Sequence, residues 1–213
     1  MLRVLLLFAL CTTPVQASPI LITMGDSNTF DHLGTGWPSQ LQTLLPSWDV
    51  RWAGEHIYAG PGSRASDDPG FLFVFPISSH PYVEWLFDDM PPVPLVVMLA
   101  WGTNDIGSGH TAAETAAALD VLHDWLASPY TFPIIATIPR IMDPAKAWMN
   151  PLIDETNALL VSTYGDCLVD FYAATPTADP YYMPDGVHFT DDGHAARASE
   201  AMTVLGELLE RCT

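Results

Sequence analysis

The sequence contains few basic residues. Among 213 residues, 7 are Lys or Arg and 25 are Asp or Glu, and the formal net charge is −18 at pH 7. Proteins that bind nucleic acid need a cationic surface to displace the counterions of the phosphates, so this composition argues against a nucleic-acid partner. Charge-driven docking on an anionic membrane is disfavoured for the same reason. The acidity is typical of a soluble protein from a salty or extracellular setting.

The sequence also lacks an apolar run long enough to cross a bilayer, which takes about 20 residues. The run near the start, Val4–Leu10, is far shorter, follows the positive charge of Arg3, and precedes small residues at Val15 and Ala17. This three-part pattern is typical of a secretory signal peptide. We therefore expect cleavage after Ala17, a secreted or periplasmic protein with no stable membrane anchor, and a functional domain of residues 18–213.

Cysteine is scarce, with three residues in the chain. A lipoprotein signal ending at Cys11 is disfavoured, because Leu10 stands where a small residue is expected. Cleavage would leave Cys167 and Cys212, and an even number of cysteines in an oxidising compartment favours a disulfide between them. The alternative is two buried free thiols. No CxxC motif or Cys/His spacing indicates zinc, and we expect no metal or other cofactor.

Short apolar runs alternate with helical patterns along the rest of the chain. The runs predict strands over residues 20–24, 50–53, 93–100, 133–138 and 167–171, and the patterns predict helices over 37–45, 111–127, 151–164 and 190–212. This alternation predicts a single α/β domain with a parallel sheet covered by helices on both faces. The aromatic stretch 67–90 predicts a packed loop, or else an apolar wall beside a site.

Clusters of polar residues and glycine follow four of the five predicted strands. They are Gly25-Asp26-Ser27-Asn28, Gly60-Pro61-Gly62-Ser63, Gly102-Thr103-Asn104-Asp105 and Asp185-Gly186-Val187-His188. In α/β sheets, ligands bind at the carboxyl ends of the strands, so these clusters share one edge. Each cluster alone is a weak signal. A Gly-Asp-Ser turn occurs by chance, and an Asp-x-x-His pair is more often a hydrogen bond within a loop.

Together and in this order, the clusters resemble the sequence blocks of the SGNH hydrolase (GDSL-type esterase) superfamily. Those blocks are Gly-Asp-Ser, a lone glycine in a loop, Gly-x-Asn-Asp and Asp-x-x-His; the first, third and fourth match residue for residue. The resemblance spans residues 20–209. It implies a flavodoxin-like, three-layer α/β/α sandwich with about five parallel strands. An α/β-hydrolase elbow is excluded, because Thr29 stands where that motif needs a glycine.

The residue types explain what such a site can do. A serine hydroxyl is a weak nucleophile until a base removes its proton, and histidine is the side chain suited to that task near neutral pH. Ser27 is therefore the candidate nucleophile and His188 the candidate base. Asp185 can accept a hydrogen bond from the other ring nitrogen and fix the tautomer.

The resemblance further implies three donors to the oxyanion that forms when serine attacks an acyl carbonyl. They are the backbone N–H of Ser27, the backbone N–H of Gly62 and the side-chain amide of Asn104. Gly60 is a less suitable alternative to Gly62. Asp26 and Asp105 are interpreted as residues that shape the two turns. His194 is interpreted as part of a helix start, not as a metal ligand.

The sequence thus predicts an exported serine esterase that acts on a small-molecule or glycan ester. Three alternatives stay open: a carbohydrate O-acetyl esterase, a thioesterase, and a non-catalytic binding protein of the same fold. Sugar rings could stack on Trp37, Trp85 or Trp101, whereas the aromatic stretch 67–90 could wall an acyl pocket. The sequence does not report the oligomeric state.

Overall fold

The structure, a computed structural model, describes residues 18–29, 35–51, 95–127, 131–177 and 180–211. The expected signal peptide (1–17) and the aromatic stretch 67–90 lie outside these residues. None of the helices in the described ranges combines the length and apolarity that crossing a membrane requires.

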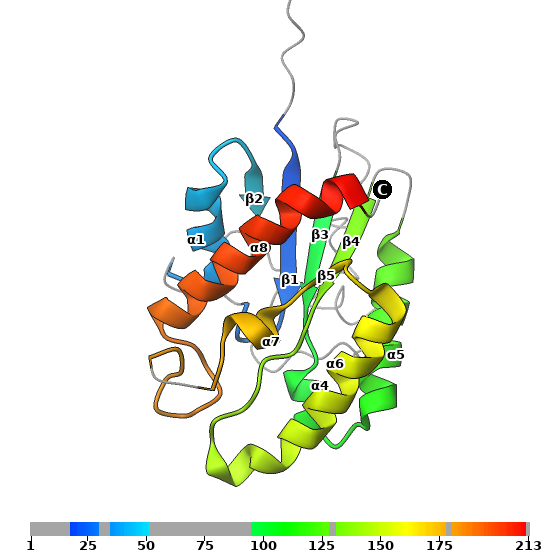
Figure 1. Cartoon of the computed structure of the whole chain (residues 1–213), viewed down its shortest axis with the longest axis vertical. Helices are drawn as coiled ribbons and strands as arrows, with labels where there is room; N and C mark the ends of the chain where they lie inside the picture. The colour runs from blue at the N-terminus through cyan, green and yellow to red at the C-terminus, as the bar shows by residue number, and fades with distance from the viewer. Residues whose placement is uncertain (1–17, 30–34, 52–94, 128–130, 178–179, 212–213) are drawn as a thin grey trace, which may run out of the picture.

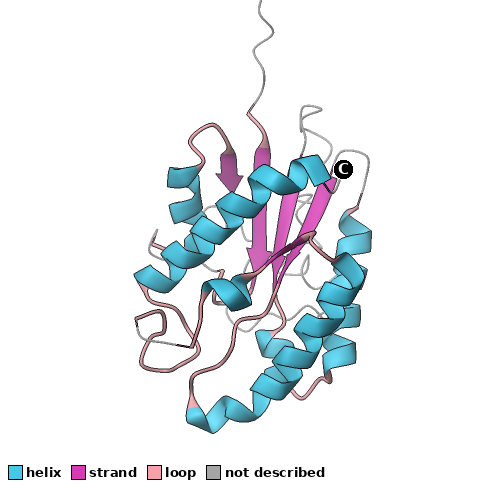
Figure 2. Cartoon of the chain, viewed as in Figure 1, coloured by secondary structure: helices cyan, strands magenta, loops and turns pink. Residues whose placement is uncertain are grey.

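A parallel sheet of five strands forms the middle layer, in the order β2-β1-β3-β4-β5 (Figures 1 and 2). The strands are β1 (Ile20–Gly25), β2 (Asp49–Arg51), β3 (Leu95–Ala100), β4 (Thr131–Ala136) and β5 (Leu168–Val169). Every neighbouring pair is parallel. This is the doubly wound order of flavodoxin-like folds, so the predicted fold class is confirmed. Ligands bind at the carboxyl ends of the strands in such sheets, and the order reverses at β1.

Helices cover both faces of the sheet (Figure 1). The longer ones are α1 (Trp37–Leu44), α5 (Ala112–Leu126), α6 (Asn150–Tyr164) and α8 (Asp191–Arg211). Helices α5 and α6 pack on one face, while α1 and α8 pack on the other and contact each other. Thr111 and Glu114 form a capping box at the start of α5, since each side chain accepts from the other residue's backbone N–H.

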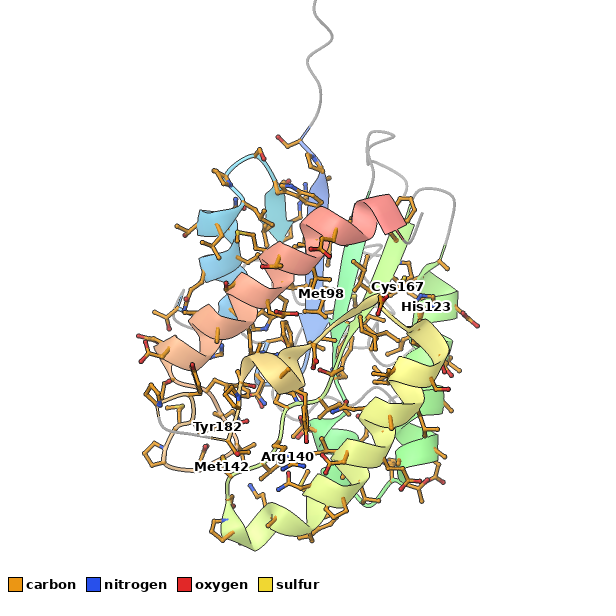
Figure 3. All side chains as sticks on the ribbon, viewed as in Figure 1. Met98, His123, Arg140, Met142, Cys167 and Tyr182 are labelled. Carbon is orange, nitrogen blue, oxygen red and sulfur yellow. The ribbon has the colours of Figure 1, made fainter. Side chains whose placement is uncertain are left out.

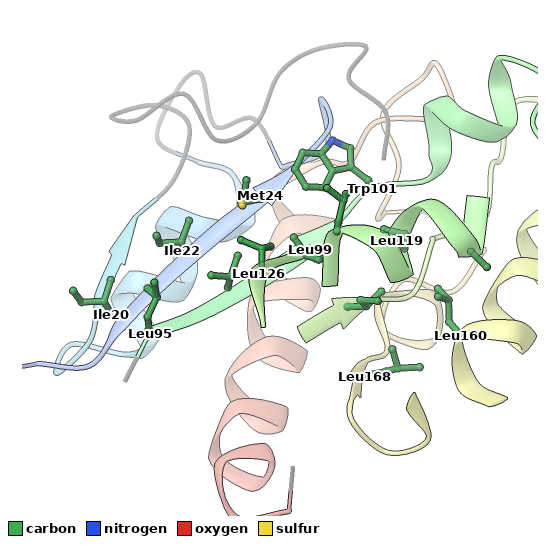
Figure 4. Close-up of a cluster of buried hydrophobic side chains, with 14 residues drawn as sticks. Ile20, Ile22, Met24, Leu95, Leu99, Trp101, Leu119, Leu126, Leu160 and Leu168 are labelled. Carbon is green, nitrogen blue, oxygen red and sulfur yellow. The ribbon is translucent and has the colours of Figure 1, made fainter. Parts of the chain in front are cut away.

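Alternation along β1 and β3 explains the two apolar cores. Ile22 and Leu99 point to the face covered by α5 and α6 (Figure 4), whereas Leu21 and Met98 point to the face covered by α1 and α8. Both strands are buried throughout. Strands that are buried on both faces have continuous apolar sequences, which is why β1 and β3 could be predicted from the sequence.

Three short elements were not expected from the sequence: α4 (Thr103–Gly107), the 3-10 helix η1 (Pro144–Met149) and α7 (Phe171–Ala174). Helix α7 ends the last strand earlier than predicted. The Asp170 side chain accepts a hydrogen bond from the Ala173 N–H and caps α7, so the chain leaves the sheet after Val169. The fourth strand runs over Thr131–Ala136, slightly earlier than predicted, because Thr131 already pairs with Leu95.

Candidate active site

The turn after β1 presents Ser27 at the carboxyl end of the sheet. Asp26 Oδ1 accepts the Asn28 N–H at 2.9 Å, and the Asp26 carbonyl accepts the Thr29 N–H at 2.9 Å. A side chain at Gly25 would lie 2.6 Å from the Ala100 carbonyl oxygen, so glycine is required there. Asp26 therefore shapes the turn, as expected, and Ser27 is half-buried at its tip.

A second loop carries Asp185 and His188. An isolated antiparallel bridge between Tyr182 and Phe189 closes it, and the Met183 N–H donates to the His188 carbonyl at 2.8 Å. Within the loop, Asp185 Oδ1 accepts the backbone N–H of His188 at 3.0 Å and that of Val187 at the same distance. These bonds use one carboxylate oxygen of Asp185 and leave the other for the imidazole.

The structure brings Ser27, His188 and Asp185 together in one hydrogen-bonded chain. Ser27 Oγ lies 3.0 Å from His188 Nε2, and His188 Nδ1 lies 2.6 Å from Asp185 Oδ2. Burial acts to raise the pKa of Asp185, but the hydrogen bonds from the His188 side chain and from two backbone N–H groups outweigh it and lower the pKa to about 2. An ionised carboxylate only accepts hydrogen bonds, so Nδ1 carries the proton and Nε2 is left to accept from the serine hydroxyl.

The segment after β4 braces the loop that holds Asp185 and His188. The backbone N–H groups of Met142 and Asp143 donate to the Gly186 carbonyl at 2.7 and 3.2 Å. The Tyr182 hydroxyl donates to the Arg140 carbonyl at 2.9 Å, and Figure 3 shows Arg140, Met142 and Tyr182 close together. Gly186 has φ +63°, and a side chain there would lie 2.3 Å from the Asp143 nitrogen. Only glycine fits this contact without strain.

Gly186→Ala is expected to lower the thermal unfolding temperature more than Gly165→Ala does. Both glycines have positive φ (+63° and +57°), but nothing lies within 4 Å of a side chain at Gly165. Gly165→Ala therefore costs only the strain of a positive φ at alanine, about 1–3 kcal/mol. Gly186→Ala carries the same strain and must also displace the Asp143 backbone. Circular dichroism melts of the two variants test this. Equal unfolding temperatures would show that the Met142–Asp143 segment is not packed against the loop as described.

Asn104 lies at the same edge of the sheet as Ser27. It belongs to α4, which follows β3, and β3 pairs with β1 along its whole length. Gly102 allows the abrupt change from strand to helix, because it adopts φ +124°. Asn104 is partly exposed, while Asp105 beside it is fully buried. Of the other predicted oxyanion groups, Gly62 and its alternative Gly60 lie outside the described residues.

Two buried charges lie beneath the Ser27 turn. The Asp26 and Arg197 side chains line a small cavity there, and both residues are at most 2% exposed. Burial raises the pKa of Asp26 to about 6, with the Asn28 N–H and the Arg197 charge acting in the opposite direction. Burial lowers the pKa of Arg197 to about 10, so the guanidinium stays charged at neutral pH.

Sequence reasoning missed Arg197. A signal was present, because Arg197 precedes Ala198, Ala201 and Leu205, which form a buried stripe on α8 at helical spacing. An arginine beside such a stripe has its guanidinium directed to the interior, where it needs partners.

The prediction that Trp37 and Trp101 could stack on sugar is wrong, because both side chains are buried; Trp37 packs edge-on against Phe171. Trp85 lies outside the described residues.

The remaining predictions concern the cysteines, the start of the last helix and metal binding. Cys167 takes part in a disulfide, while Cys212 lies outside the described residues, so the Cys167–Cys212 pairing stays a prediction. Thr190 caps α8, since its hydroxyl accepts the Gly193 N–H at 3.3 Å. Within the described ranges, no group of three His, Cys, Asp or Glu side chains is placed to hold a metal ion.

Comparison with known proteins gives one family. Residues 23–196 match the model of the GDSL-like Lipase/Acylhydrolase family. No curated protein sequence matches the chain significantly.

Solved structures of similar fold cover most of the chain at low identity. A member of the lipolytic protein G-D-S-L family from Veillonella parvula is 20% identical with a TM-score of 0.70, and the match covers 89% of this chain and 100% of that one. A carbohydrate esterase family 3 structure from Talaromyces cellulolyticus is 17% identical with a TM-score of 0.64, covering 90% and 98%. A carbohydrate acetylesterase family member from Sinorhizobium meliloti has the same identity and TM-score, covering 90% and 99%. These similarities establish a shared fold.

Proposed function

This chain belongs to the GDSL-like lipase/acylhydrolase family, and we propose that it cleaves carboxylic esters through a covalent acyl-enzyme on Ser27. Family membership makes the protein an enzyme that hydrolyses ester bonds, which disfavours the alternative of a non-catalytic binding protein. One observation carries the proposal of mechanism: the hydrogen-bonded chain from Ser27 Oγ through His188 to Asp185 Oδ2, with distances of 3.0 and 2.6 Å.

In the first half of the reaction, Ser27 Oγ attacks the acyl carbon while His188 Nε2 takes the hydroxyl proton. The carbonyl electron pair moves onto the oxygen and forms a tetrahedral oxyanion. Asp185 stabilises the imidazolium through the bond to Nδ1. When the oxyanion collapses, the bond to the alcohol breaks, and the leaving oxygen takes the proton from Nε2. An acyl group then remains on Ser27.

The second half repeats these steps with water. Nε2 of His188 takes a proton from water as its oxygen attacks the acyl carbon. Collapse of the second oxyanion breaks the bond to Ser27, and the proton returns to Oγ. The carboxylic acid leaves, and the starting protonation state is restored. The side chains of His188 and Asp185 are both more than one third exposed, so water can reach the base.

Asn104 is proposed as an oxyanion donor through its side-chain amide, because α4 holds it at the same edge of the sheet as Ser27. Asn104→Ala is expected to lower kcat by about 10²–10³-fold, the usual effect of removing one such donor. KM should change little, because the donor acts most strongly on the transition state. Steady-state kinetics on a p-nitrophenyl ester measure both constants. An unchanged kcat would remove Asn104 from the site, and Ser162→Ala on the exposed surface of α6 is the control.

The substrate class is tested with p-nitrophenyl esters from acetate to long acyl chains, together with an acetylated oligosaccharide. A carboxylesterase of broad range should hydrolyse several chain lengths. Strict preference for acetate, with release of acetate from the oligosaccharide, would support a carbohydrate O-acetyl esterase instead. Two of the structurally similar proteins carry carbohydrate esterase names, which makes this the second candidate. An acyl thioester in the same series tests thioesterase activity, and inertness on all substrates would contradict ester hydrolysis.

We also propose that the protein is exported. The N-terminal pattern of Arg3, the apolar run Val4–Leu10 and Ala17 supports this. The disulfide of Cys167 supports it independently, because structural disulfides persist mainly in oxidising compartments. Mass spectrometry of protein collected outside the cytoplasm should give a chain that begins at Ser18. Recovery of the full chain in the cytoplasm alone would contradict export.

A further inference from the structure

Arg197 lies in an unusual environment for a cation. It projects from α8 into the interior, where its guanidinium carbon is 4.3 Å from the ring centroid of Phe171, 5.0 Å from that of Phe189 and 5.5 Å from that of Trp37. The residue is 1% exposed. Burying a guanidinium is costly unless it is paired and hydrogen-bonded, so its contacts define what it does there.

The first contact is with the nucleophile turn. Arg197 Nη1 donates to the Asn28 carbonyl at 2.8 Å, and the Asn28 N–H donates to Asp26 Oδ1 at 2.9 Å. Asn28 directly follows Ser27, so the residue after the nucleophile is held at both its backbone N–H and its carbonyl. A charged donor makes the carbonyl bond stronger than a neutral one would.

The second contact is with the loop that carries the base. Phe189 directly follows His188, and its ring lies against the Arg197 guanidinium. Phe189 also forms the bridge to Tyr182 that closes this loop, and the two rings lie 4.8 Å apart. Arg197 therefore touches the residue after the nucleophile and the residue after the base.

We propose that Arg197 is a positioning residue that ties the Ser27 turn to the His188 loop and thereby maintains the 3.0 Å distance between Ser27 Oγ and His188 Nε2. The proposal rests on the function proposed above. Loss of Arg197 would remove its hydrogen bond to the Asn28 carbonyl and its contact with the Phe189 ring, and the two segments could then shift relative to each other. A misplacement of about 1 Å in an active site can reduce the rate about a hundredfold.

The test compares four proteins: wild type, Arg197→Met, Asp26→Asn/Arg197→Met, and Leu205→Ala. Methionine retains apolar bulk but cannot hold the Asn28 carbonyl, and it leaves the Asp26 charge buried without a cation. The double variant removes that charge, while the amide oxygen of asparagine can still accept the Asn28 N–H. Leu205 is buried on the same helix, in a core cluster that includes no described residue of the Ser27 turn or of the His188 loop, so Leu205→Ala serves as the control for loss of stability.

We expect Arg197→Met to lower both the unfolding temperature and kcat, the latter by about 10–100-fold, with KM nearly unchanged. The double variant should regain much of the lost unfolding temperature, because removing both buried charges restores a balanced interior, but it should not regain kcat. Leu205→Ala should melt earlier and retain wild-type kcat. All kinetics are measured at a temperature where circular dichroism shows each variant folded.

Two outcomes would overturn the proposal. If kcat of the double variant returns to the wild-type value together with its stability, Arg197 only balances the Asp26 charge. If Leu205→Ala loses kcat as Arg197→Met does, the rate follows stability and not position. Crystal structures of wild type and the double variant supply a readout that needs no activity. If the distance between Ser27 Oγ and His188 Nε2 is equal in both structures, the positioning role is wrong. This readout holds even if the wild type is inactive on esters and the proposed function fails.

Discussion

A Ser27→Ala variant is expected to hydrolyse p-nitrophenyl acetate at least about a thousandfold more slowly than wild type. Alanine lacks the oxygen that attacks the acyl carbon, so no acyl-enzyme can form. Residual turnover would come from the proposed oxyanion donors and from binding. The measurement is kcat/KM for both proteins at pH 8.

Folding provides the control for this variant. Ser27→Ala removes a single oxygen and its hydrogen bond to His188. Because the Ser27 side chain is half-buried and not in the core, the unfolding temperature should stay nearly unchanged. A fluorophosphonate probe should label wild-type protein on the peptide that contains Ser27 and should not label the variant. Equal activity of the two proteins would show that Ser27 is not the nucleophile.

Asp185→Asn is expected to reduce kcat/KM by at least about a thousandfold, since the equivalent change in a serine protease triad costs about 10⁴. The asparagine oxygen can still accept the backbone N–H groups of Val187 and His188. Its amide would then donate toward His188 Nδ1, which places the ring proton on Nε2 and prevents that nitrogen from accepting the serine proton. Asp166→Asn, an exposed change outside the site, is the matched control.

The pH dependence of wild type carries a related expectation. The pKa of Asp185 is lowered to about 2 from 3.8, so the carboxylate stays ionised throughout the range in which esterases are assayed. An acid whose pKa is lower in the folded than in the unfolded protein stabilises the fold at pH values above its unfolded pKa. That stabilisation is lost as the pH falls from about 4 toward 2. Loss of activity between pH 5 and 8 would therefore arise from another group. Full activity of Asp185→Asn would contradict the role given to Asp185.

The central sheet and the site loops could be predicted because their causes are local. The buried strands β1 and β3 read as continuous apolar runs, and Asp185 and His188 are joined by hydrogen bonds within one short loop. The link from Ser27 to His188 spans 161 residues, and only the resemblance to a family indicated it.

What could not be predicted depends on contacts between distant segments. Arg197 finds its partner, the Asn28 carbonyl, only when α8 packs over the sheet. The brace of Met142 and Asp143 on Gly186 joins the segment after β4 to a loop much further along the chain. The apolar stripe of α8 indicates that Arg197 faces the interior, but no pattern in the sequence identifies the partner of Arg197 or that of Gly186.

The distribution of the site along the chain has a consequence for synthesis. Ser27 follows the first strand of the sheet, whereas His188 directly precedes the last helix. Because synthesis starts at the N-terminus, the proposed nucleophile is made early and the proposed base only near the end. Helix α8 must also dock against α1 before Arg197 can reach the Asn28 carbonyl. If the proposed mechanism holds, a nascent or C-terminally truncated chain contains Ser27 without His188, and we expect ester cleavage to begin only once synthesis and folding are essentially complete.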